Sequence, residues 1–157
     1  MFWCARPATY YCLLMTGERR NGFWDAVNGR APMPTASTTL GWSLTQADTE
    51  RGEVEVAFVA TEAFLNPAGS VQGGFLTAML DDTMGPALAS TLDAGLYPTT
   101  LELKVSFLRP AKAGRLVGRG RVVHSGRSIA FLAGELSDET GQVVAVGSAT
   151  VRIVRNG

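Results

Sequence analysis

The sequence predicts an α+β fold in which about six antiparallel strands curl around one long helix. Residues Phe75 to Leu92 form the longest apolar stretch rich in Ala, Leu and Met, and the stretch is apolar on nearly all sides, as expected for a helix enclosed by protein. Segments that alternate between apolar and polar residues, such as Thr100 to Leu108, lie on both sides of it and predict strands. A single helix among many strands favours a sheet that wraps around that helix.

Turn and helix-breaking residues divide the chain into its elements. Residues Gly22 to Asn28 place apolar side chains on one side of a short helix, and a glycine follows its end. A loop rich in Pro, Gly and Asn, Asn66 to Gly74, precedes the long helix, whose middle is weakened by Gly85 and Pro86. The expected strands are Thr39–Thr45, Glu53–Ala60, Thr100–Leu108, Arg115–His124, Ser128–Ser137 and Val143–Val154, with turns at Ser125–Arg127 and Asp138–Gly141.

The composition fits one domain and argues against nucleic-acid, metal and membrane partners. The chain has 157 residues, and its 14 basic residues balance 14 acidic ones, whereas nucleic-acid binding needs a positive field. No apolar run approaches the roughly 20 residues of a membrane span. His124 is the only histidine, and both cysteines, Cys4 and Cys12, lie near the N-terminus, so we expect neither a metal site nor a disulfide framework. The scarcity of cysteine fits a cytoplasmic location.

The first residues differ from the rest of the chain. The segment Met1 to Met15 is aromatic, carries only Arg6 as a charge and shows no helical or strand period. We expect residues 1–18 to form a flexible or loosely packed N-terminal extension, and residues 19–157 to form a single domain. A targeting segment fits less well, because a basic start, a longer apolar run and a small-residue cleavage site are missing. An element of an interface is a further alternative.

Three features between Asn66 and the middle of the long helix point to chemistry. Gly73 and Gly74 stand where helix amides lack partners and can polarise a carbonyl, although such a pair more often marks a simple junction. Asp81 and Asp82 are costly in an apolar helix unless they are paired or functional, and at 100° per residue they point in different directions. One of them can be a base or nucleophile beside a pocket. Asn66 can hold water or a carbonyl, although such residues more often cap turns.

Together these features resemble the thioesterase superfamily with the hot-dog fold, in particular its phenylacetate-pathway-like (PaaI-like) branch. That family has an Asn, a His-Gly-Gly whose His stands six residues later, and an acid nine residues after the His. Asn66, Gln72-Gly73-Gly74 and Asp81 fall at these spacings. The resemblance covers roughly Gly22 to Ile153 and includes an aromatic-x-Arg-Pro strand end at Phe107–Pro110, a turn at Ser125–Ser128 and the final strand, Gly141 to Thr150.

The resemblance implies hydrolysis of an acyl-CoA thioester to the free acid and coenzyme A, without a metal or organic cofactor. Asp81 would be the general base or the nucleophile, and the amide of Gly73 would polarise the carbonyl. Asn66 would position water or the carbonyl, and Thr100, one residue away from a family position, would help to hold the water. Gln72 replaces the usual His, and because it can neither act as a base nor carry charge, only a positioning role remains for it.

The geometry of one helix requires at least two copies of the chain in an active enzyme. Eight residues separate Gly73 from Asp81, which is about 12 Å along a helix at 1.5 Å per residue. An oxyanion donor and a base must both lie about 3 Å from one reacting group. A second copy, antiparallel to the first across a two-fold axis, supplies the missing group. We therefore expect a homodimer or a dimer of dimers (a homotetramer), in agreement with the family.

Coenzyme A carries phosphates, and Arg109, Arg127 and Ser128 are the candidates to bind them. They lie at a strand end and in a turn within the matched segments, and Arg binds phosphate through paired hydrogen bonds. Solvated surface is the simpler interpretation of each residue taken alone. Arg152 and Arg155 are further candidates near the C-terminus.

Two other functions remain as alternatives on the same fold. A non-catalytic acyl-CoA-binding sensor is compatible with Gln72, but it gives little reason for the Asp81 carboxylate. A hot-dog dehydratase uses a His together with an acid, and no His lies near the predicted site.

Overall fold

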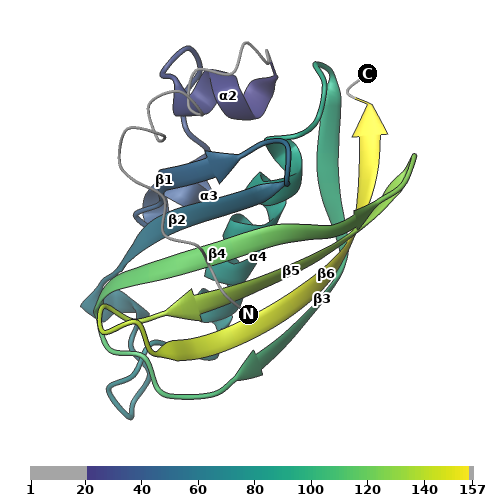
Figure 1. Ribbon diagram of the computed structural model, residues 1–157. Helices are drawn as coiled ribbons and strands as arrows, with labels where there is room; N and C mark the ends of the chain where they lie inside the picture. Colours follow the sequence, from purple (N-terminus) through teal and green to yellow (C-terminus); the bar gives the residue numbers. More distant parts are fainter. Residues whose placement is uncertain (1–20, 156–157) are drawn as a thin grey trace.

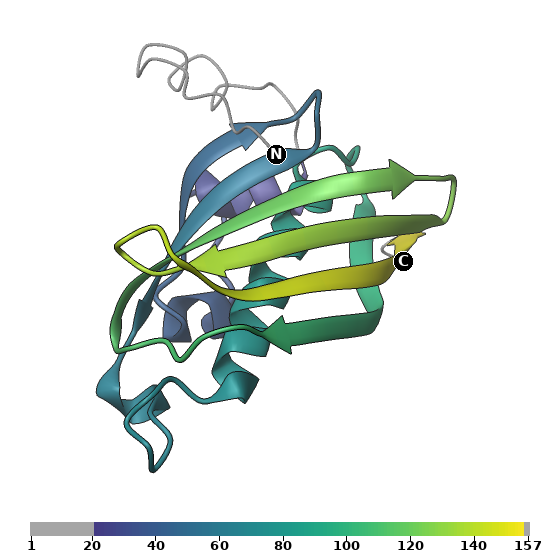
Figure 2. The ribbon, with the colours of Figure 1, turned by 60° about the horizontal axis from the view of Figure 1, so that its bottom comes forward.

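The computed structural model describes residues 21–155, so the predicted extension at residues 1–18 lies outside the described residues. A six-stranded antiparallel sheet, in the order β1-β2-β4-β5-β6-β3, packs against the long helix α4 (Gly73–Ala89). Figure 1 shows the sheet curling around α4, and in Figure 2 the helix lies behind the strands. The predicted α+β architecture, the hot-dog fold, is therefore confirmed. The strands are β1 (Ser43–Asp48), β2 (Glu53–Ala60), β3 (Leu96–Phe107), β4 (Gly114–Ser125), β5 (Ile129–Ser137) and β6 (Val143–Arg155).

Two segments near the N-terminal end of the domain differ from the prediction. The expected short helix is present as α2 (Gly22–Val27), but the first strand was predicted too early. The structure instead has a helix, α3 (Thr35–Thr39), which ends at the residue where the strand was expected to begin. A short 3₁₀ helix, η1 (Glu62–Phe64), follows β2. The hydroxyls of Thr38 and Thr39 donate to the carbonyls of the residues four positions earlier, which satisfies them within a helical turn.

Strand β3 begins four residues earlier than predicted because it lies at the edge of the sheet. The proline at its start, Pro98, pairs with Ile153 of β6. A proline cannot donate a backbone hydrogen bond, and it is tolerated where one side of the strand has no neighbour. One edge of β3 is therefore unpaired along its length in the described chain.

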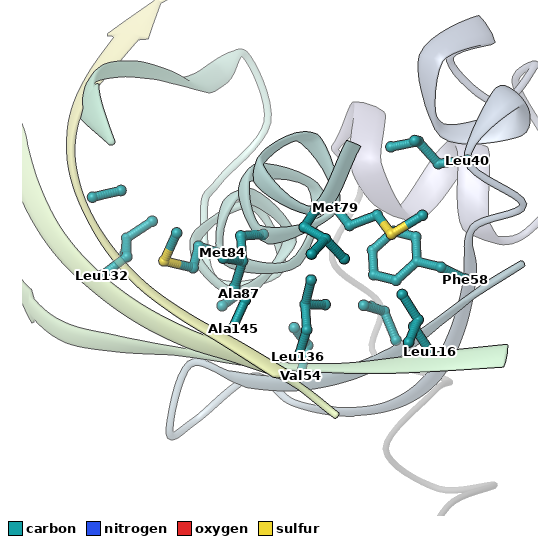
Figure 3. Close-up of a cluster of buried hydrophobic side chains, with 14 of the residues drawn as sticks. Leu40, Val54, Phe58, Met79, Met84, Ala87, Leu116, Leu132, Leu136 and Ala145 are labelled. Atoms are coloured by element: carbon teal, nitrogen blue, oxygen red, sulfur yellow. The ribbon is translucent and has the colours of Figure 1, made fainter. Parts of the chain in front are cut away.

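The hydrophobic core lies between α4 and the sheet. Figure 3 shows Met79 and Met84 of α4 beside Phe58, Leu132 and Leu136 of the strands, and all five side chains are buried. Burying a side chain of this size stabilises the fold by about 1.5–3 kcal/mol. The same cluster includes Leu40, Val54, Ala87, Leu116 and Ala145.

Strand β4 approaches α4 closely because glycine stands at the point of contact. A Cβ atom on Gly120 would lie 2.5 Å from the backbone oxygen of Thr83, which no side chain tolerates. This close packing fixes the helix against the sheet and so determines which residues of α4 point away from it.

Helix α2 closes the C-terminal end of α4. The Asn21 side chain donates to the carbonyls of Ala89 and Leu92 at 2.9 and 2.7 Å, and it accepts from the amide of Trp24. The indole of Trp24, which is fully buried, donates to the carbonyl of Ser90 at 3.1 Å. These bonds satisfy carbonyls at the helix end that have no partner within the helix.

One face of α4 is not covered by its own chain. Gly74 and Ala78 are exposed, and Asp81 and Gly85 are partly exposed. The sequence predicts a helix that is apolar on nearly all sides and enclosed by protein. A single chain leaves this small-residue face uncovered. Within residues 21–155 no helix is both long and apolar enough to cross a membrane.

Candidate active site

Asp81 lies on α4 and points toward the edge strand β3. Its Oδ1 atom accepts a hydrogen bond of 2.9 Å from the hydroxyl of Thr100. Thr100 pairs with the buried residue Val151 in the sheet, which places its side chain on the face toward α4. The structure therefore brings together two residues that the sequence predicts to share a site.

Asp82 points in a different direction from Asp81, as the helical rotation of 100° predicts. Its side chain faces Ser37 of α3, and its Oδ2 atom is buried without a hydrogen-bond partner. Burial raises the pKa of Asp82, a hydrogen bond from Ser37 opposes the rise, and the nearby Asp81 adds to it. The carbonyl of Asp82 accepts from the indole of Trp42 at 2.9 Å. Asp82 is thus the more desolvated of the two carboxyls, and it is turned away from Thr100.

The N-terminus of α4 presents backbone N–H groups that have no acceptor within residues 21–155. Helix α4 begins at Gly73, and the side chain of the capping residue Gln72 makes no capping hydrogen bond. The amides of Phe75 and Leu76 donate to the carbonyl of Gln72, but those of Gly73 and Gly74 donate to no residue in the described part of the chain. Free amides at the positive end of a helix dipole can bind a developing negative charge.

The two glycines at this end differ in their surroundings. A Cβ atom on Gly73 would lie 2.9 Å from Cζ of Phe107, whereas nothing lies within 4 Å of the same position on Gly74. The aromatic ring of Phe107 therefore rests against the backbone of Gly73. Phe107 belongs to the aromatic-x-Arg-Pro motif, but no sequence pattern shows that its ring meets a residue 34 positions earlier.

Asn66 caps a turn, which is the simpler of its two predicted roles. Its Oδ1 atom accepts from the amides of Ala68 and Ser70 at 3.0 and 3.2 Å. The loop is further closed by the amide of Asn66, which donates to the carbonyl of Ser70. This geometry leaves the Nδ2 amide group of Asn66 as the part of the side chain that can donate to a ligand.

The three residues predicted to bind coenzyme A lie at two different ends of the sheet. Arg127 and Ser128 belong to the exposed turn before β5, next to Arg152 and so near the Thr100 end of β3. Arg109 follows the opposite end of β3, where its guanidinium donates to the carbonyl of Val143 at 2.8 Å. One chain therefore does not bring Arg109 together with Arg127.

The site as a whole is divided in the same way. Asp81 and Thr100 form one half, and Asn66, Gln72 and Gly73 form the other, about 12 Å away along α4 at 1.5 Å per residue. Within residues 21–155 no group of three or more His, Cys, Asp and Glu side chains is arranged to hold a metal ion.

Comparisons with known proteins point to one family. The family described as the thioesterase superfamily matches residues 68–145. A solved structure of a phenylacetic acid degradation-related protein from Ralstonia eutropha is 46% identical, covers 84% of this chain and 99% of its own, and superimposes with a TM-score of 0.82. Human acyl-coenzyme A thioesterase 13 is 27% identical over 63% of this chain and 71% of its own length.

A third relative was solved with a ligand. The protein smu.793 from Streptococcus mutans, in a structure bound to acetyl CoA, is 25% identical to this chain. The match covers 73% of this chain and 90% of that protein, with a TM-score of 0.66.

Proposed function

Because this chain belongs to the thioesterase superfamily, we propose that it hydrolyses an acyl-CoA thioester to a free acid and coenzyme A. The observation that carries the proposal is the Asp81 carboxylate, which is oriented by the Thr100 hydroxyl on a helix whose first amides are free. The similarity to human acyl-coenzyme A thioesterase 13, and to a protein that was solved with acetyl CoA, supports coenzyme A as the thiol.

Asp81 drives the attack on the thioester carbon by one of two routes. As a general base it takes a proton from water while the water oxygen forms the new bond to carbon. As a nucleophile it forms a mixed anhydride that water then hydrolyses. In both routes the carbon–sulfur bond breaks, and coenzyme A leaves as a thiol after it gains a proton. Thr100 holds the carboxylate in place, and the Gly73 amide stabilises the negative charge on the carbonyl oxygen.

The active unit in this proposal is a homodimer in which two copies share each site. Asp81 and Thr100 of one copy meet Asn66, Gln72 and Gly73 of the other, because one helix cannot bring both sets to one carbon. The Nδ2 group of Asn66 and the Gln72 amide then position water or the carbonyl. Gln72 acts there only through hydrogen bonds, since it has no basic group.

Two exposed features support this pairing. The unpaired edge of β3 carries Tyr97, Leu101 and Phe107, whose side chains are 54%, 57% and 53% exposed. Such an edge readily pairs with a strand of a second copy. Beside it, the small-residue face of α4 has open space around Gly74 and Gly85, which lets a second helix approach closely.

An antiparallel pair of chains also brings together the residues proposed to bind coenzyme A, which lie far apart in one chain. Arg127 and Ser128 lie near the Asp81 half of the site, and Arg109 lies near the Gly73 half, so a shared site has all three at its rim. Arg109 uses one N–H group for the Val143 carbonyl and keeps others for a phosphate.

A thiol-release assay over a panel of acyl-CoAs tests the proposal. We expect the wild-type protein to release thiol from at least one acyl-CoA. Asp81→Asn should lower kcat by at least about 10²-fold, since it removes the base or nucleophile. Asp82→Asn is the matched control, because that side chain faces Ser37 instead of Thr100. An Asp81→Asn rate within about threefold of wild type would refute the role of Asp81. Binding of acyl-CoA without any thiol release would instead identify the non-catalytic sensor that Gln72 permits.

A further inference from the structure

Strand β3 contacts α4 at both halves of the proposed site. At one end the Thr100 hydroxyl reaches Asp81, and at the other the ring of Phe107 lies against Gly73. A Cβ atom built on Gly73 would lie 2.9, 3.1 and 3.4 Å from the Cζ, Cε2 and Cε1 atoms of that ring. The tip of the ring therefore occupies the space directly beside the backbone whose amide is free.

Phe107 is not a core residue. Its side chain is 53% exposed and does not belong to the buried cluster between α4 and the sheet. The contact also explains the glycine at position 73, because a larger side chain there would collide with the ring. The neighbouring Gly74 has no such constraint, since nothing lies within 4 Å of its Cβ position. The ring and the glycine thus form a packed pair at the N-terminus of α4, and about half of the Phe107 surface stays exposed in the single chain.

A carbonyl that accepts a hydrogen bond from the Gly73 amide must lie close to this ring. The donor nitrogen and the oxygen are about 2.7–3.1 Å apart in such a contact. The acyl group is attached to the carbonyl carbon through its α-carbon. Substituents on that α-carbon therefore lie close to the side chain that packs against Gly73. In this chain that group is Phe107.

We propose that Phe107 determines which acyl groups the site accepts, by limiting the bulk on the carbon next to the thioester carbonyl. The inference rests on the proposed thioesterase function and deepens it. Unbranched acyl-CoAs fit beside the ring, whereas acyl groups that are branched or aromatic at that carbon collide with it. Removing the ring opens space for the second group of substrates.

The test compares three CoA thioesters: butyryl-CoA, the α-branched isobutyryl-CoA and benzoyl-CoA. The full-length wild type, Phe107→Ala, Phe107→Leu and the control Phe131→Ala are assayed for kcat/KM with each thioester. Phe131 is 47% exposed, and it lies between the buried residues Ala130 and Leu132 of β5, so its ring is on the face of the sheet away from α4. Melting temperatures show whether each variant is folded.

We expect Phe107→Ala to raise kcat/KM for the branched and aromatic thioesters, relative to butyryl-CoA, by about tenfold or more, in line with the effect of reshaping an apolar pocket. Phe107→Leu is expected to shift the ratio in the same direction by a smaller factor, and it decides the matter if the alanine variant does not fold. Phe131→Ala should leave the ratio unchanged.

The two proposals fail in different ways. If the wild type hydrolyses butyryl-CoA but both Phe107 variants keep its substrate ratio within about twofold, the role of Phe107 is wrong and the thioesterase function stands. A wild type that releases no coenzyme A from any of the three thioesters would overturn both.

Discussion

Replacing Thr100 with valine removes the hydroxyl that donates to Asp81 and keeps the shape of the side chain. The bond lost is 2.9 Å long and ends on a carboxylate oxygen. Hydrogen bonds to charged groups contribute about 1.5–3 kcal/mol, and Thr100 is exposed in the single chain, so water competes for its partner and the lower end applies. A change of about 1.4 kcal/mol in the barrier is about tenfold in rate, so we expect kcat to fall roughly tenfold. KM should change little, because the bond orients a reacting group and does not hold the substrate.

Thr99→Val provides the matched control for this change. Thr99 has the same side chain and precedes Thr100 directly, but successive residues of a strand point to opposite faces, so its hydroxyl is turned away from α4. Thiol release at saturating acyl-CoA, with circular dichroism to show that both variants are folded, gives the comparison. A folded Thr100→Val variant that keeps kcat within about twofold of wild type, or a Thr99→Val variant that loses as much, would refute the positioning role.

Two further changes test the surroundings of the site. Burial raises the pKa of Asp82 despite the hydrogen bond from Ser37, so wild type loses stability as the pH rises from about 4 through that raised pKa. Asp82→Asn cannot ionise, and its melting temperature relative to wild type should therefore increase over that pH range; parallel curves would contradict this. Asn21→Ala removes the side-chain donor to the Ala89 and Leu92 carbonyls, although the Leu92 amide still donates to the Ala89 carbonyl at 3.3 Å. The unpaired Leu92 carbonyl alone costs about 1–3 kcal/mol, so urea unfolding should show a clear loss of stability, and an unchanged midpoint would contradict the capping role.

The general architecture could be predicted because it follows from local patterns. Alternation fixes the strands, and the long apolar segment fixes α4, so the order of elements follows from the sequence. The errors arise where tertiary contacts, and not local patterns, determine the secondary structure. The branched shape of Thr39 favours a strand, yet its hydroxyl, like that of Thr38, donates to a carbonyl within a helical turn of α3. Pro98 signals the end of a strand, but at a sheet edge it is accommodated within β3.

The candidate site could be predicted only in part for a similar reason. Helical rotation shows that Asp81 and Asp82 diverge, but it cannot say which of them meets Thr100, and that choice came from the family spacing. The contact between Phe107 and Gly73 depends on how β3 crosses α4, which no periodicity encodes. The division of the site into two halves follows from helix length alone, and it is therefore the most general inference that the sequence supports.

The shared site can be tested by mixing two inactive variants. One is Asp81→Asn. The other is Gly73→Pro, which removes the backbone N–H at the first position of α4; Gln72 before it has φ −62° and ψ 140°, which suits a following proline. The added Cβ would lie 2.9 Å from Cζ of Phe107, so this variant also displaces that ring, and both effects fall in the Gly73 half of the site. In a dimer that contains one copy of each, both defects fall in the same site, and the other site has an intact Asp81 and an intact Gly73.

Co-refolding the two inactive variants at equal concentrations tests most directly whether each active site is built from two copies of the chain. Random pairing makes about half of the dimers mixed, each with one intact site of two, so we predict recovery of about a quarter of wild-type activity. Mixed dimers that form, as shown by distinguishable affinity tags, but stay as inactive as the separate variants would contradict a site built from two copies.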